Sequence, residues 1–159
     1  MNISIRRRDL GLAAAGWCSG CAGPIAAAPS ADSDDARTYR ALRQIRGHFD
    51  GGRWSDDIDR WQGRKHLAMQ NLAGELLRAH ASVEVLRNTM GEPDAVLEPG
   101  QPAHARALEQ VQWLPKAATP DSAKRTRLWL YQWRGRHDQL LLALERDKVV
   151  AAGWLFDGE

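Results

Sequence analysis

The sequence predicts an α+β domain, and three observations support this class. First, residues 126–156 hold three apolar segments separated by the short polar turns GRHD and RDK, which is typical of a three-stranded antiparallel meander. Second, apolar residues upstream recur at helical spacing. Third, both cysteines, Cys18 and Cys21, lie in the first 28 residues, so a packed core must stabilise the rest. We therefore expect two to three N-terminal helices packed on a three- to four-stranded antiparallel meander sheet.

Alternation along the meander assigns its side chains to two faces. Leu128 and Leu130 are predicted on one face, because successive strand side chains point to opposite sides. If residues 146–148 form a three-residue turn, one wall pairs Leu144, Leu142 and Leu140 with Val150, Ala152 and Trp154. The other wall is predicted to carry Trp129, Tyr131, Trp133, Leu141 and Ala143. This second wall is too apolar for a solvated face, so a helix, a second copy or a partner must cover it.

The aromatic row Trp129, Tyr131 and Trp133 has two interpretations. It is a candidate partner-binding face, because exposed Trp and Tyr side chains are favoured interface anchors. Alternatively it is plain core, since most such rows are buried. In that case an apolar helical stripe covers it, formed by Tyr39, Leu42, Ile45 and Phe49.

Residues 1–28 have the layout of an export signal, with a basic start, an Ala/Gly-rich middle and small residues before a polar stretch. The run Arg7-Arg8-Asp9-Leu10 is similar to the twin-arginine pattern, and ordinary Sec export stays open. Ser19-Gly20-Cys21 has the form of a lipobox end, which predicts lipidation at Cys21; cleavage near Ala27 is the alternative. Residues 29–36 are predicted as a linker or helix cap, and residues 37–159 as a single domain.

Three helices are predicted upstream of the meander, over residues 37–49, 65–80 and 82–90. Ser82 is a plausible N-cap of the third helix, and His80 is expected half-buried on the apolar stripe of the second. A short strand is predicted over residues 95–97 and another over residues 108–114. Loops are expected over residues 97–105 and 115–125, and the SDDIDRWQG stretch is expected as a connector with at least one packed tryptophan.

A tight corner follows the third helix. Gly91 permits a positive φ, Pro93 fixes the next turn, and Asp94 can accept hydrogen bonds from backbone amides. The stretch SVEVLRNTMGEPD with this corner, followed by VQWLP, LWLYQW, LLLALE and DKVVAAGW, resembles the BamE/SmpA-OmlA-like domain over about residues 65–156. The resemblance implies a bacterial envelope lipoprotein or periplasmic protein that acts through protein partners, including outer-membrane assembly.

Charge and motifs give little support for other classes. The leader holds Arg6, Arg7, Arg8 and Asp9, so the remainder carries 19 basic and 19 acidic residues, without the basic excess of a nucleic-acid binder. No nucleophile-elbow, P-loop or dinucleotide motif occurs. Imidazole and carboxylate groups gather between His48 and His66, but their spacing matches no common metal motif, so a solvated polar loop is expected there.

We therefore assign no catalytic, cofactor-binding or metal-binding residue and expect a non-enzymatic cell-envelope protein that acts by protein–protein contact. Its expected partner is another envelope protein or complex, possible roles being outer-membrane assembly or maintenance. Contact with a membrane is expected only through a lipid on Cys21, and nucleic acid is not an expected partner. The alternative is a periplasmic or secreted enzyme inhibitor or immunity-type protein. The sequence leaves the partner and the oligomeric state open.

Overall fold

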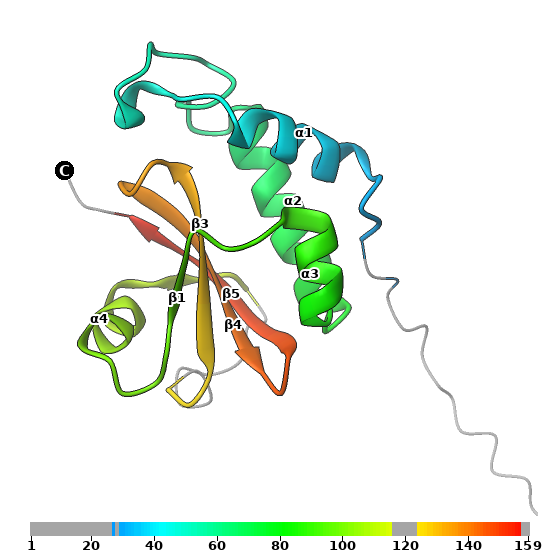
Figure 1. The fold of residues 1–159 in the computed structure, drawn as a ribbon, viewed down its shortest axis with the longest axis vertical. Coiled ribbons are helices and arrows are strands. Elements are labelled where there is room, and N and C mark those ends of the chain that lie inside the picture. Colours follow the sequence, from blue (N-terminus) through cyan, green and yellow to red (C-terminus); the bar gives the residue numbers. More distant parts are fainter. Residues whose placement is uncertain (1–26, 28, 116–123, 157–159) are drawn as a thin grey trace, which may run out of the picture.

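The computed structural model describes residue 27 and residues 29–115 and 124–156, and its architecture is α+β, as the sequence predicts (Figure 1). Its helices are α1 (Asp34–Arg43), the 3-10 helix η1 (His48–Asp50), α2 (Arg64–Arg78), α3 (Val83–Met90) and α4 (Pro102–Gln110). Its strands are β1 (Ala95–Leu97), β2 (Gln112–Trp113), β3 (Arg127–Arg134), β4 (Asp138–Glu145) and β5 (Lys148–Phe156). Among the described helices, none has the length and apolar character needed to cross a membrane.

The described strands form one antiparallel sheet in the order β1-β3-β4-β5-β2. The predicted meander β3–β4–β5 is its centre, and the short strands β1 and β2 pair with its two sides, so the sheet has more strands than expected. The strand predicted over residues 108–114 is wrong except at Gln112–Trp113, and the loop predicted over residues 97–105 is helical from Pro102. Proline suits the first turn of a helix, and α4 then turns His104 and Ala107 toward the sheet.

The pairing of β3 with β4 corrects the predicted walls. Trp129 lies opposite Leu142 and Tyr131 lies opposite Leu140, so these leucines share a face with the aromatic row. Leu141 and Ala143 instead lie with Leu128 and Leu130 on the other face. A bulge between Gln132 and Arg134 sets this register, and alternation within one strand carries no information about it.

The turn between β4 and β5 is one residue shorter than predicted. Glu145 pairs with Lys148, and the two turn residues Arg146 and Asp147 have φ of 49° and 60°, the left-handed pair that a tight hairpin requires. A bulge beside Leu144 then restores the predicted register, in which Leu142 faces Ala152 and Leu140 faces Trp154. Leu144 faces Val149 rather than Val150.

The helical predictions hold best for α2 and α3. Ser82 accepts a hydrogen bond from the Val85 amide, as expected of an N-cap. α1 begins at Asp34, within the predicted linker, because Ser33 caps it, and it ends well before Phe49. His80 is exposed beyond the end of α2, so its predicted half-buried place is wrong.

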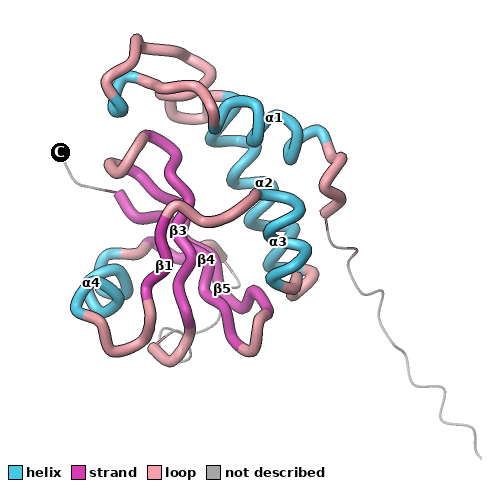
Figure 2. The backbone as a smooth tube through the Cα atoms, viewed as in Figure 1, coloured by secondary structure: helices cyan, strands magenta, loops and turns pink. Residues whose placement is uncertain are grey.

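Two apolar clusters lie on the two faces of the sheet. Figure 2 shows the helices on these faces, with α2 and α3 on one side of the strands and α4 on the other. The larger one, here called the helix-face core, joins α1, α2 and α3 to the aromatic row of β3; the smaller one lies under α4. Trp129 is 2% exposed, and Tyr131 and Trp133 are fully buried. The row is therefore core, and its interpretation as an exposed partner face is corrected. Tyr39 of the predicted covering stripe packs edge-on against Tyr131, whereas Ile45 is exposed.

The corner after α3 has the structural role that its residues predict. Gly91 has a φ of 80° and its carbonyl oxygen accepts a hydrogen bond from the Tyr131 hydroxyl at 3.0 Å. One carboxylate oxygen of Asp94 accepts from the Gln132 amide at 2.7 Å, and the other pairs with the Arg43 guanidinium at 2.7 Å. The corner thus ties α1 and α3 to β3.

Candidate functional site

The sequence-predicted site residues do not form one site. Cys21 and the export leader lie outside the described residues, and the aromatic row lies in the core. The polar patch between His48 and His66 is dispersed by other contacts: Asp59 and His66 are fully buried, and Asp56 and Asp57 face arginines. Across the described ranges, no group of three His, Cys, Asp or Glu side chains is placed to hold a metal ion.

The exposed aromatic side chains lie instead on the connector, residues 44–63, between α1 and α2. Trp54 is 55% exposed and Trp61 is 51% exposed, and Leu67 at the start of α2 is also exposed. A groove of about 380 Å³ runs beside Trp61, with Leu67 and a polar set along its walls: Asp56, Asp57, Arg60, Gln62, Gly63 and Arg64. The Trp54 indole N–H donates at 2.8 Å to Asp56, which is one of the residues that line this groove. We call this region the connector surface.

Asp59 holds the connector in shape from within. Its carboxylate is fully buried and accepts hydrogen bonds from two backbone amides, those of His48 at 3.0 Å and Ser55 at 2.8 Å. A buried carboxylate that accepts from amides in this way stands in for the backbone partners that an irregular loop lacks. The exposed tryptophans are thus carried on a loop with a fixed backbone.

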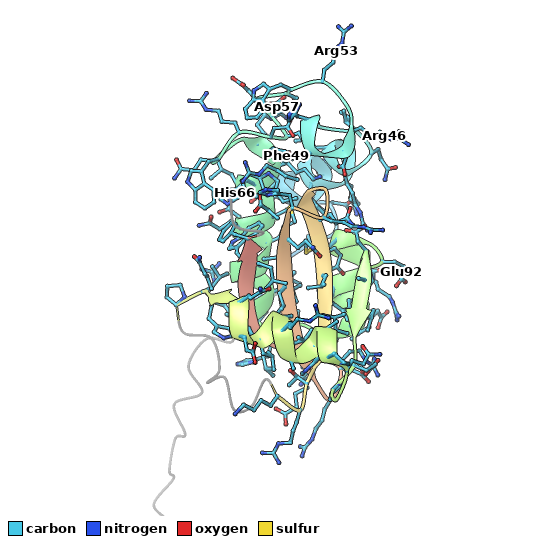
Figure 3. The ribbon with its side chains drawn as sticks, turned by 90° about the vertical axis from the view of Figure 1, so that its left-hand side faces the viewer. Arg46, Phe49, Arg53, Asp57, His66 and Glu92 are labelled. Atoms are coloured by element: carbon cyan, nitrogen blue, oxygen red, sulfur yellow. The ribbon has the colours of Figure 1, made fainter. Side chains whose placement is uncertain are left out.

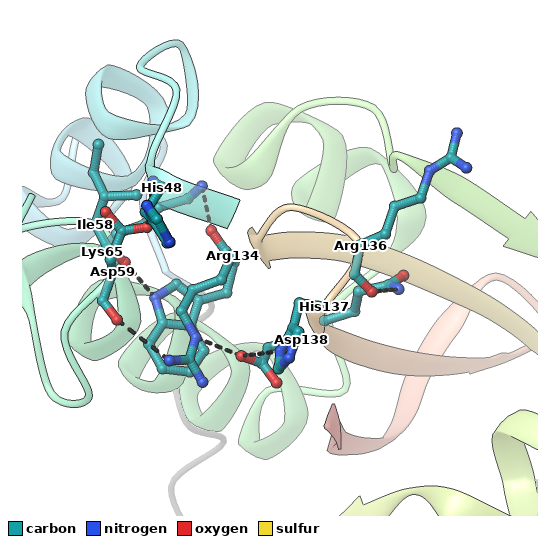
Figure 4. A network of polar contacts seen from close by, with 10 residues as sticks. His48, Ile58, Asp59, Lys65, Arg134, Arg136, His137 and Asp138 are labelled. Carbon is teal, nitrogen blue, oxygen red and sulfur yellow. Dashed lines mark hydrogen bonds and ion pairs between the residues drawn. The ribbon is translucent and has the colours of Figure 1, made fainter. Parts of the chain in front are cut away.

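The connector also docks on the end of the sheet where β3 turns into β4 (Figure 4). The Trp133 indole N–H donates to the Ile58 carbonyl at 2.7 Å, and the Lys65 ammonium donates to the Trp133 carbonyl at 2.7 Å. Burial lowers the pKa of Lys65 from its ordinary value. Every group in this chain of contacts is buried, so the connector is anchored to the helix-face core.

Arg134 closes the same end. Its guanidinium lies 4.3 Å from the centre of the Trp133 ring and 4.8 Å from that of Phe49, and it forms an ion pair with the buried carboxylate of Asp138. The His137 ring also approaches Asp138, at 3.2 Å. Figure 3 shows Phe49 and His66 between this sheet end and the outer side chains of the connector, among them Arg53 and Asp57.

His66 lies behind Trp61 in a box of aromatic rings. Its ring centre is 4.3 Å from that of Trp61, 4.5 Å from that of Trp133 and 4.9 Å from that of Trp154. Neither ring nitrogen has a hydrogen-bond partner. Burial, and secondarily the charge of Arg134, lowers the pKa of His66 to about 4, with Asp138 opposing the shift. The imidazole is therefore neutral at pH 7 and acts as an aromatic wall for Trp61.

Comparison of the chain with models of protein families, with curated proteins and with solved structures finds no match. The connector is a braced loop that presents two half-exposed indoles. Two ion pairs lie beside Trp61: Arg60 with Asp56 at 3.7 Å and Arg64 with Asp57 at 3.4 Å. This arrangement is suited to binding another macromolecule through an apolar centre and a polar rim.

Proposed function

We propose that this chain is a non-enzymatic protein of the bacterial cell envelope that binds another envelope protein or complex through its connector surface. The observation that carries this proposal is the exposure of Trp54 and Trp61 on a loop whose backbone is fixed by the buried carboxylate of Asp59. Tryptophan is the residue type most often found as a hot spot in protein interfaces, and a pre-ordered loop loses little entropy on binding.

The polar groups around Trp61 support a protein partner rather than an anionic surface. The groove beside Trp61 is lined by two aspartates and two arginines, so its formal charge is balanced; they are Asp56, Asp57, Arg60 and Arg64. A nucleic acid or an anionic membrane would be attracted by an excess of positive charge. A balanced rim around an apolar centre is the ordinary composition of a protein interface.

The envelope location in this proposal rests on the sequence alone. The leader with Arg7, Arg8 and Cys21 supports export, and lipidation of Cys21 would hold the domain at a membrane while residues 22–33 link it to α1. The resemblance to the BamE/SmpA-OmlA-like domain supports a role in outer-membrane assembly or maintenance, and an enzyme inhibitor is the alternative.

The experiment that tests the proposal compares one double variant and one single variant with the unmodified chain, each expressed in the native host cell. Trp54→Ala with Trp61→Ala removes the apolar centre of the connector surface, whereas Val96→Ala trims an apolar side chain that is 41% exposed on β1. Envelope proteins retained by each tagged variant are identified by mass spectrometry. We expect the double tryptophan variant to lose a partner that both the unmodified chain and Val96→Ala retain.

Two results would contradict the proposal. Equal retention of every partner by the double variant and the unmodified chain removes the connector surface as the contact site. Retention of a single soluble enzyme, released by the Trp substitutions, favours the inhibitor alternative. Thermal unfolding of each purified variant is measured in parallel, so that a lost partner is attributed to the surface only when the fold is intact.

A further inference from the structure

Three tryptophans form the walls of the box around His66, and they are fixed to different degrees. Trp133 is fully buried and its indole N–H is bonded to Ile58, and Trp154 is 4% exposed in the middle of β5, where it pairs with Leu140 and Gln112. Trp61 forms the outer wall, and among the described residues none accepts a hydrogen bond from its indole. Trp61 also contacts the rings of Trp133 at 5.7 Å and Phe156 at 5.9 Å, but it is the most exposed of the three walls, so the box opens most easily on its side.

Trp61 belongs to a turn that is small enough to move as a unit. The Gly63 amide donates to the Arg60 carbonyl at 2.8 Å and closes the turn, while Gln62 between them has a φ of 60°, which is unfavourable for a residue with a side chain. The connector upstream is held by Asp59, and α2 begins directly after Gly63. The Gly63 carbonyl accepts from the Leu67 amide at 3.0 Å, and the Lys65 amide donates to the Asp57 carbonyl at 2.8 Å. Opening the turn breaks the bond between the Gly63 amide and Arg60, and these two contacts still hold α2 and the connector upstream together.

Protonation of His66 is unfavourable while the box is closed. An imidazolium has two N–H donors, and neither nitrogen has an acceptor within the box. Attraction of the cation to the indole faces offsets only part of the lost hydration.

The charged groups that face the ring do not compensate. Arg134 on β3 opposes a positive charge on His66. Asp138 on β4 favours that charge, but it is already paired with Arg134 and lies 3.2 Å from the His137 ring. On α2 itself the neighbouring Lys65 donates to the Trp133 carbonyl, and on the connector Asp59 is committed to backbone amides. A protonated His66 therefore gains most by reaching water.

We propose that residues 60–63 form an acid-sensitive gate, in which protonation of His66 moves Trp61 away from the box and lets water reach the imidazole. The closed gate is the form that the structure shows, with the Trp61 ring packed at a tilt of 42° against a neutral imidazole. The open gate has a hydrated imidazolium and an indole released from its support. The proposal concerns this chain alone and requires no partner.

Linkage sets the size of the effect. The imidazole has an ordinary pKa of 6.5 when hydrated and a pKa of about 4 when enclosed. Between pH 7.5 and pH 5 the ratio of open to closed molecules should therefore rise roughly 25-fold, because the open form takes up a proton that the closed form excludes. Little change is expected above pH 7, where both forms are neutral.

Amide hydrogen exchange measured by NMR on the full-length chain tests the gate. The probe is the Gly63 amide, whose protection factor, corrected for the intrinsic exchange rate at each pH, reports the opening of the turn. We expect that protection to fall roughly 25-fold from pH 7.5 to pH 5. We also expect Gly63 to remain less protected than the central-strand amide of Leu142 at every pH.

Two variants provide the controls. His66→Phe keeps an aromatic ring in the box but cannot titrate, so it should abolish the pH dependence at Gly63. His80→Gln removes a histidine that is exposed beyond the end of α2 and should leave the dependence unchanged.

Three outcomes would overturn the gate: the same pH dependence in His66→Phe, constant protection in the unmodified chain, or equal protection of Gly63 and Leu142, which indicates global unfolding only. If His66→Phe does not fold, the ring of His66 is titrated by NMR in the unmodified chain. A midpoint below pH 5 supports the enclosed imidazole, and one near pH 6.5 overturns it.

Discussion

Two pairs of tryptophans in this chain have opposite environments. Trp129 and Trp133 on β3 are almost fully buried beneath α2 and α3, whereas Trp54 and Trp61 on the connector are each more than half exposed. The first pair belongs to the strand that the sequence marks most clearly, and the second to an irregular stretch between two helices. The aromatic row in β3 therefore stabilises the fold, whereas the connector presents its two indoles to solvent.

The largest expected effect in this comparison comes from the buried pair. Trp133→Ala removes a fully buried ring, the hydrogen bond to Ile58 and the stacking surface of Arg134. We expect the free energy of unfolding to fall by about 3–5 kcal/mol. Urea denaturation followed by circular dichroism measures this change, and Trp54→Ala is the matched control, with an expected change of about 0.5 kcal/mol or less. Equal losses in the two variants would contradict the assignment of core and surface.

A smaller but pH-dependent effect comes from His66, which supports Trp61 and contacts Trp133. Because burial depresses its pKa from 6.5 to about 4, the unfolded chain binds a proton over this range that the folded chain excludes. The stabilising contribution is complete above pH 6.5 and declines as pH falls, by about 3 kcal/mol at pH 4. Urea unfolding of the unmodified chain and of His66→Phe at several pH values isolates this term. If the free energy of unfolding depends on pH in the same way in both proteins, His66 does not contribute to that dependence.

The brace under the exposed pair gives a further test. Asp59→Ala leaves the His48 and Ser55 amides without their acceptor, and water can reach only part of this region, so we expect a loss of roughly 2 kcal/mol. Asp59→Asn retains one carbonyl acceptor and should lose less. The decisive readout is amide exchange of residues 48 and 55 against that of β4: increased exchange confined to the connector agrees with a local brace, and unchanged exchange contradicts it.

The smallest expected effect on folding comes from the proposed anchor site. Cys21→Ala should leave the unfolding free energy of the domain unchanged and should move the protein from the membrane fraction to the soluble fraction, because the residue proposed to carry the lipid is lost. Fractionation of cells that express either form measures this. An unmodified mature terminus near Ala27 would instead establish the alternative cleavage.

The parts of the fold that could be predicted from the sequence are those fixed by local pattern. The β3–β5 segments, the α2 stripe, the Ser82 cap and the Gly91 turn each depend on residues close together in the chain. The strand predicted over residues 108–114 failed in its first part, because apolar and polar residues alternate only over residues 111–113. Pro102 and the buried Ala107 belong to a helix that lies against the sheet.

The candidate site could not be predicted in the same way. The buried contacts of Ile58 and Asp59 fix the backbone that carries Trp54 and Trp61. The partner of the Ile58 carbonyl is Trp133, which is 75 residues away in the sequence. The wall assignment failed for a related reason, since the bulge near Trp133 that sets the β3–β4 register has no signal in the sequence. Contacts between distant segments place the indoles, and residue types alone do not reveal those contacts.

The claim that the connector surface is the binding face is tested most directly by site-specific photo-cross-linking in intact cells. A photoreactive amino acid is placed at Leu67, which lines the groove beside Trp61, or at Val96 on β1, and both native side chains are exposed. We predict one discrete cross-linked envelope protein from position 67 that is absent from position 96 and is lost when Trp54 and Trp61 are replaced by alanine. Equal cross-linking from both positions, or cross-linking from position 67 that persists without the two tryptophans, would contradict the proposed binding face.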